Sequence, residues 1–124
     1  MRFKDQVVIV TGAGSGQGRV EAMLFAKEGA HVVVDDFNKD GADETLRLIK
    51  QQRTAGKVMV SYADVRREEE VRAMVEEVVE QFKKIDVLVN NAGIYRGHSV
   101  PETSEEEWYE VIDTNLKGPF LCSK

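Results

Sequence analysis

Four glycines crowd one turn near the start of the chain, in the stretch Thr11-Gly12-Ala13-Gly14-Ser15-Gly16-Gln17-Gly18. A backbone that must approach a diphosphate closely cannot carry side chains there, and glycine also adopts the positive φ of a tight turn. A helix that begins after such a turn aims unpaired N–H groups and the positive end of its dipole at an anion. This stretch, the glycine turn, therefore predicts a nucleotide site without naming a reaction.

The spacing of these glycines separates several kinds of nucleotide site. The usual dinucleotide fingerprint, Gly-x-Gly-x-x-Gly, is not met from either of the first two glycines. No Gly-Lys-Ser/Thr follows, so the turn is not a P-loop. Gly12-x-Gly14-x-Gly16 would also suit an S-adenosylmethionine-dependent methyltransferase. The spacing Thr11-Gly12-x-x-x-Gly16-x-Gly18 differs from all of these patterns and is more informative about the kind of nucleotide site.

Two acids, Asp35 and Asp36, follow the second apolar run of the chain. Asp36 comes 24 residues after Gly12, close to the roughly 20 residues typical of an acid that binds a ribose. A carboxylate there accepts hydrogen bonds from the adenosine ribose and repels the 2′-phosphate of NADP. The neighbouring positions, Phe37 and Ser15, supply no cation to neutralise that phosphate. The sequence favours NAD, and we expect Asp35 to be a solvated acid that points the other way.

Short β-branched runs alternate with helical patterns along the whole chain. Strands are expected at residues 7–10, 32–34, 57–62 and 85–89, and helices at 18–27, 41–53, 71–82 and from Ser104 onward. Val20, Met23, Leu24 and Ala26 are expected to face the core from the first helix. Buried strands joined by helices imply right-handed βαβ units in a parallel sheet. Such a sheet binds ligands at the carboxyl ends of its strands, here near residues 11–18, 35–37, 62–65 and 90–96.

The motif Asn90-Asn91-Ala92-Gly93 directly follows the fourth expected strand. Together with the glycine turn, Asp64-Val65 and Asn115-Leu116-x-Gly118, it resembles the short-chain dehydrogenase/reductase family through all 124 residues. A methyltransferase would explain the glycines but not the asparagine pair. The resemblance implies an α/β fold, the N-terminal half of a Rossmann-like doubly wound parallel sheet. About four strands in the order 3-2-1-4 would form one truncated dinucleotide-binding domain over residues 1–124.

The same resemblance implies a role for individual residues. The backbone of Ser15, Gln17 and Gly18 would line the pyrophosphate. Asp36 would hold the adenosine ribose, and Asp64 with the Val65 backbone would contact the adenine edge. Asn115 matches the asparagine of the family's catalytic tetrad, which kinks its helix and anchors a water of the proton relay. Ile94, Tyr95 and Arg96 would border the substrate mouth. The expected cofactor-binding residues are Gly12, Ser15, Gly16, Gln17, Gly18, Asp36, Phe37, Asp64, Val65, Asn90, Ala92 and Gly93.

The chain departs from the family pattern in two respects. Gln17 stands where the family usually has an apolar residue. The family's catalytic serine and its Tyr-x-x-x-Lys pair are not found, because no tyrosine is followed by a lysine four residues later. That tyrosine would be the acid/base and the lysine would lower its pKa. We therefore expect an NAD-binding portion that is inactive alone.

The expected whole enzyme is an oxidoreductase that transfers a hydride between a nicotinamide cofactor and an alcohol or carbonyl substrate. A non-catalytic short protein that binds a nucleotide or a partner is the alternative, and a methyltransferase is a minor one. With the last helix unfinished and the fourth strand at an open edge, we expect either self-association, as in a homo-oligomer, or only marginal folding.

Composition narrows the remaining classes. The net charge of -5 disfavours a nucleic-acid partner. No apolar run approaches the roughly 18 residues of a membrane span, and the first residues do not form a signal peptide. The single cysteine, Cys122, fits a reducing compartment, so a cytoplasmic protein is expected. His31 and His98 have no second ligand at metal spacing, so no metal site is expected.

Overall fold

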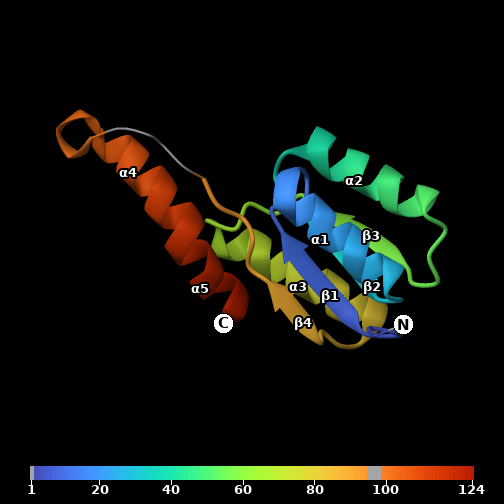
Figure 1. Ribbon diagram of the computed structural model, residues 1–124. Helices are drawn as coiled ribbons and strands as arrows, with labels where there is room; N and C mark the ends of the chain where they lie inside the picture. Colours follow the sequence, from blue (N-terminus) through green and yellow to red (C-terminus); the bar gives the residue numbers. More distant parts are fainter. Residues whose placement is uncertain (1, 95–98) are drawn as a thin grey trace.

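A computed structural model of the chain describes residues 2–94 and 99–124. Four parallel strands form a sheet in the order β3-β2-β1-β4 (Figure 1). This confirms the predicted fold class and strand order, and the bounds of the strands and of the helices that join them agree with the predicted ones to within three residues. The strands are β1 (Val7–Thr11), β2 (His31–Asp35), β3 (Val58–Ser61) and β4 (Val87–Val89), and the helices that join them are α1 (Gly16–Lys27), α2 (Lys39–Gln51) and α3 (Glu68–Phe82).

The helices cover both faces of the sheet, as a doubly wound fold requires. Side chains alternate along β1, so Val8 and Val10 pack with α1 and α2, whereas Val7 and Ile9 pack with α3. Each central strand is therefore buried on both sides, which is why it is a continuous apolar run rather than an alternating one.

The C-terminal part was expected as one helix from Ser104 onward, and it is one continuous helix that contains a π-helical turn. Helix α4 (Glu105–Ile112) and helix α5 (Gly118–Ser123) are joined by a π-helical turn, η2 (Asp113–Lys117), and a short 3₁₀ turn, η1 (Val100–Glu102), precedes them. The Ser104 hydroxyl accepts a hydrogen bond from the Glu107 N–H at 3.0 Å, so the predicted cap is confirmed. Figure 1 shows α4 and α5 as one continuous helix, with α4 farther from the sheet and α5 closer to it. None of the described helices combines the length and apolarity needed to cross a bilayer.

The inner face of α1 agrees with the prediction only in part. Met23 and Ala26 pack against the core as expected. Val20 and Leu24 are instead more than half exposed, at 55% and 56%, and Ala22 is buried in their place. The cause is Gly18, because a Cβ added there would overlap the Gly12 carbonyl oxygen and the Asn91 amide. This close approach sets the rotation of the helix, so the residues four and eight positions later face the sheet and must be small.

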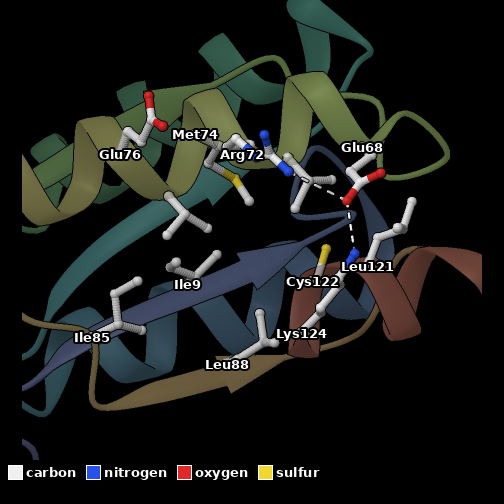
Figure 2. Close-up of a pocket in the computed structure, with 12 residues that line it drawn as sticks. Ile9, Glu68, Arg72, Met74, Glu76, Ile85, Leu88, Leu121, Cys122 and Lys124 are labelled. Carbon is white, nitrogen blue, oxygen red and sulfur yellow. Dashed lines mark hydrogen bonds and ion pairs between the residues drawn. The ribbon is translucent and has the colours of Figure 1, made fainter.

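Strand β4 forms one edge of the sheet and pairs with β1. Beside it lies an apolar groove of about 370 Å³ between α3 and α5, lined by Ile9, Met74, Leu88 and Leu121 (Figure 2). Lys124 and Glu68 form an ion pair at 2.8 Å on its rim. Cys122 also lines it, and burial raises the pKa of that thiol to about 11, as fits a packing residue. The self-association expected from this edge stays a prediction.

The position of Gly18 leads to a stability prediction. Gly18→Ala should lower the free energy of unfolding, because overpacking of about 1–3 kcal/mol or more exceeds the roughly 1 kcal/mol that alanine gains in a helix. Urea denaturation followed by circular dichroism measures the change. Gln17→Ala, at an exposed neighbouring position, should leave the midpoint unchanged. A Gly18→Ala chain as stable as the parent would show that α1 does not depend on this contact.

Candidate nucleotide-binding site

A pocket of about 390 Å³ lies at the carboxyl ends of the strands, where such sheets bind ligands. It brings together ten of the twelve residues expected to bind a cofactor. Of the other two, Gly18 lies beneath the turn and Asn90 points elsewhere. The lining residues are Gly12, Ser15, Gly16, Gln17, Asp35, Asp36, Phe37, Asn38, Ala63, Asp64, Val65, Asn91, Ala92, Gly93, Ile94 and Thr114.

The glycine turn is shaped by two different requirements. A Cβ at Gly12 would lie 2.7 Å from the Ala92 Cα, and one at Gly14 would lie 2.7 Å from the Asp36 carboxylate. The protein's own packing therefore excludes a side chain at both positions. Gly16 is different, because a Cβ there would meet nothing within 4 Å, although its φ of +53° favours glycine. The space over Gly16 is open to the pocket.

The N-terminus of α1 is left without a cap of its own. Ser15 at the N-cap makes no side-chain hydrogen bond to the helix, and the first turn holds no acid. In contrast, Asn38 caps α2 and Ser104 caps α4 through their side chains. The first N–H groups of a helix need acceptors, and those of α1 begin at the pocket. An anionic ligand fits this end of the helix.

Asp36 joins the turn after β1 to the turn after β2. Its Oδ2 accepts a hydrogen bond from the Gly14 N–H at 2.9 Å, and its Oδ1 accepts one from the Asn38 N–H at 3.0 Å. The carboxylate is half-buried and lines the pocket. It is therefore held in place before any ligand arrives.

The expectation that Asp35 is a solvated acid is wrong. Its side chain is 1% exposed, Oδ1 accepts a hydrogen bond from the Ala63 N–H at 2.9 Å, and Oδ2 is buried without a partner among the described residues. Burial raises the pKa of Asp35 to about 7, and the charges of Asp36 and Asp64 act in the same direction, against hydrogen bonds from Ser61 and Ala63. Strand alternation does point it away from Asp36, but that face of the sheet is covered too.

Asp64 is paired with an arginine that sequence reasoning missed. Arg66 donates to both carboxylate oxygens, at 2.9 Å to Oδ1 and 2.7 Å to Oδ2. This hydrogen-bonded pair lowers the pKa of Asp64. The same guanidinium lies 5.7 Å from the centre of the exposed Phe37 ring. The signal was the sequence Asp64-Val65-Arg66, in which the cation follows the acid at once.

Within the asparagine pair, the structure places Asn91 rather than Asn90 at the pocket. The Asn91 side chain donates to the Gly12 carbonyl at 3.1 Å. The Thr11 hydroxyl oxygen accepts hydrogen bonds from the N–H groups of Asn91 and Ala92, both at 3.1 Å. The Asn90 side chain instead donates to the Ser123 hydroxyl at 3.2 Å. Asn91 therefore joins the ends of β1 and β4.

Asn115 lies in the π-helical turn and holds the loop after Gly93. Its amide nitrogen donates to the Ile94 carbonyl at 2.8 Å, and its amide oxygen accepts from the Ile94 N–H at 2.7 Å. Ile94 lines the pocket. Tyr95 and Arg96, which were expected beside the substrate, and His98 lie outside the described residues.

Comparison with known proteins identifies the family. The family model described as short chain dehydrogenase matches residues 6–124. The chain belongs to this family. The short-chain dehydrogenases bind nicotinamide cofactors, NAD or NADP, so the methyltransferase alternative is wrong.

Individual relatives resemble this chain in sequence along its whole length. The chain is 42% identical to an uncharacterized oxidoreductase of Thermotoga maritima and 39% identical to a meso-2,3-butanediol dehydrogenase of Serratia marcescens. Each match covers 100% of this chain and 48% of the relative. A crystal structure of a short chain dehydrogenase from Mycobacterium smegmatis superposes with a TM-score of 0.92 at 34% identity, over 98% of this chain and 50% of that one. The chain thus spans about half the length of these relatives.

The burial of Asp35 makes stability depend on pH. Its folded-state pKa of about 7 exceeds the usual aspartate pKa of 3.8, so between these values the folded chain binds a proton that the unfolded chain has released. Stability from this group therefore falls as pH rises toward 7. Asp35→Asn cannot ionise, so its stability relative to the parent should rise by about 2–3 kcal/mol from pH 5 to pH 8, roughly two pH units at about 1.4 kcal/mol each.

Urea denaturation of both chains at pH 5, 6, 7 and 8 measures this difference. Glu106→Gln, which removes an exposed acid from α4, serves as the control and should run parallel to the parent. A constant difference between Asp35→Asn and the parent across this range would contradict the assignment of a proton to Asp35.

Proposed function

We propose that the chain binds NAD in the pocket, as the cofactor-binding portion of an oxidoreductase that acts on an alcohol or carbonyl substrate. The observation that carries the proposal is the uncapped N-terminus of α1 beside the open space over Gly16. Neither feature improves the packing of the protein, whereas both suit a bound phosphate. The butanediol dehydrogenase among the relatives is named for an alcohol substrate, which supports the same class here.

Each side of the pocket suits a different part of the nucleotide. In this proposal, the N–H groups of residues 15–18 bind the diphosphate and Asp36 accepts from the adenosine ribose. Asp64 and Val65 border the adenine, and the backbone of residues 92–93 borders the rest of the cofactor. The nicotinamide, when bound, donates or accepts a hydride. Asn115 fixes the Ile94 backbone at the pocket, and its role in catalysis stays a prediction.

The charges at the ribose end support NAD rather than NADP. Asp36 accepts two backbone hydrogen bonds, but its negative charge remains next to the place proposed for the ribose. The guanidinium of Arg66 lies near Phe37, but its charge is already balanced by the carboxylate of Asp64. A 2′-phosphate would therefore meet Asp36 without compensation.

Binding without turnover is the alternative that the described residues leave open. Tyr62 donates to the Asp43 carboxylate and Tyr109 packs edge-on against Trp108, and neither lines the pocket. These two side chains are therefore not placed to exchange a proton with a substrate there. The inactivity of the 124 residues alone, the homo-oligomer and the cytoplasmic location all stay predictions.

Cofactor titration tests the proposal. The parent should bind NAD(H) more tightly than NADP(H) by about tenfold, or about 1.4 kcal/mol. Asp36→Ala should reduce this ratio, because it removes the repelling charge, and Asp36→Asn should do so with less disturbance of the glycine turn. Asp40→Asn, which removes an exposed acid from the first turn of α2, should keep the ratio. Equal or tighter binding of NADP(H) by the parent would defeat the assignment of Asp36.

A further inference from the structure

Arg19 stands in a place that helix electrostatics disfavour. It lies near the N-terminus of α1, where the positive end of the helix dipole repels a cation. It is half-buried and is not among the residues that line the pocket. Hydrogen bonds within the protein must therefore offset the unfavourable helix dipole at Arg19.

The Arg19 guanidinium connects the glycine turn to α2. Nη2 donates to the Gly14 carbonyl at 2.6 Å and reaches the Gly41 carbonyl at 3.4 Å, while Nε donates to the Thr45 hydroxyl at 2.9 Å. Thr45 is fully buried, and its hydroxyl donates to the Ala13 carbonyl at 2.7 Å. Two consecutive carbonyls of the turn are thus held on the α2 side.

Holding these carbonyls also orients the N–H groups that follow them. The peptide bonds between the described residues are trans, so a C=O and the next N–H point in opposite directions. With the Ala13 carbonyl on Thr45, the Gly14 N–H faces the other way and donates to Asp36. By the same geometry, the Gly14 carbonyl held by Arg19 turns the Ser15 N–H away from α2, on the side where Ser15 lines the pocket.

We infer that Arg19 is a positioning residue that fixes the Gly14–Ser15 peptide so that its N–H faces the phosphate of a bound nucleotide. The inference rests on the proposed function, since it assigns the phosphate to this turn. Arg19 acts from behind the turn and does not contact the ligand. Its effect should therefore be greatest for ligands that carry the diphosphate.

The first test compares ADP with adenosine in binding titrations. Arg19→Met should weaken the binding of ADP by about tenfold or more, a change of about 1.4 kcal/mol in binding free energy. It should weaken the binding of adenosine by less than about threefold. Arg19→Lys keeps the charge but cannot reproduce the three hydrogen bonds, so it should recover only part of the ADP affinity. Arg47→Met is the matched control, because it removes a cation of α2 that pairs with Glu44 on an exposed face. This control should change the affinity for neither ADP nor adenosine.

A second test needs no ligand. Amide hydrogen exchange over residues 12–18 should be faster in Arg19→Met than in the parent, with exchange in β2 unchanged. Thr45→Val, which removes the hydroxyl but keeps the shape, should speed exchange in the same segment. Unchanged exchange in Arg19→Met would overturn the inference about Arg19, whether or not the chain binds ADP. A failure of the parent chain to bind ADP would instead count against the proposed function. Equal loss of ADP and adenosine affinity would also overturn it, because it would indicate a general loosening.

Discussion

The contact between α1 and the end of β1 is the constraint on which the rest of the structure depends. Gly18 lies directly against the Gly12 carbonyl, and Asn91 donates to that same carbonyl from the end of β4. No side chain fits between them, so the helix approaches the sheet more closely than a larger residue would permit. This approach sets the rotation of α1, the path of the glycine turn and the register of the loop after β4. Thr11 completes the junction by accepting two N–H groups of that loop.

The pocket beside this junction contains three acids, and the carboxyl group of each is stabilised in a different way. Asp64 is paired with an arginine, Asp36 accepts two backbone hydrogen bonds, and Asp35 is buried deeply enough to keep its proton near neutral pH. The start of α1, in contrast, presents backbone N–H donors, and no acid occupies its first turn. The pocket therefore has an end that attracts phosphate and an end that attracts hydroxyl groups. This polarity would orient a nucleotide before specific contacts are made.

The sequence predicted the topology well because topology depends on patterns that are local. Apolar runs, glycine spacing and the asparagine motif each reflect what a few neighbouring residues require. The failures concern contacts between distant segments. Helical periodicity indicates that α1 has an inner face, but the choice of Ala22 over Val20 depends on how closely Gly18 approaches β1. Likewise, strand alternation turned Asp35 away from Asp36, but it could not show that this face is covered.

The two sides of the pocket differ in rigidity, because the residues that hold one side are buried and the residue that holds the other is exposed. The glycine turn is held by Thr45, which is fully buried, and by the central strands beneath it. The loop at Ile94 depends on Asn115, an exposed residue in a π-helical turn, and the adjoining α4 has no buried residue among those described. Regions with few buried contacts open at lower free energy than the core. The proposed phosphate side should therefore be preformed, while the side nearer Ile94 can adjust to what binds there.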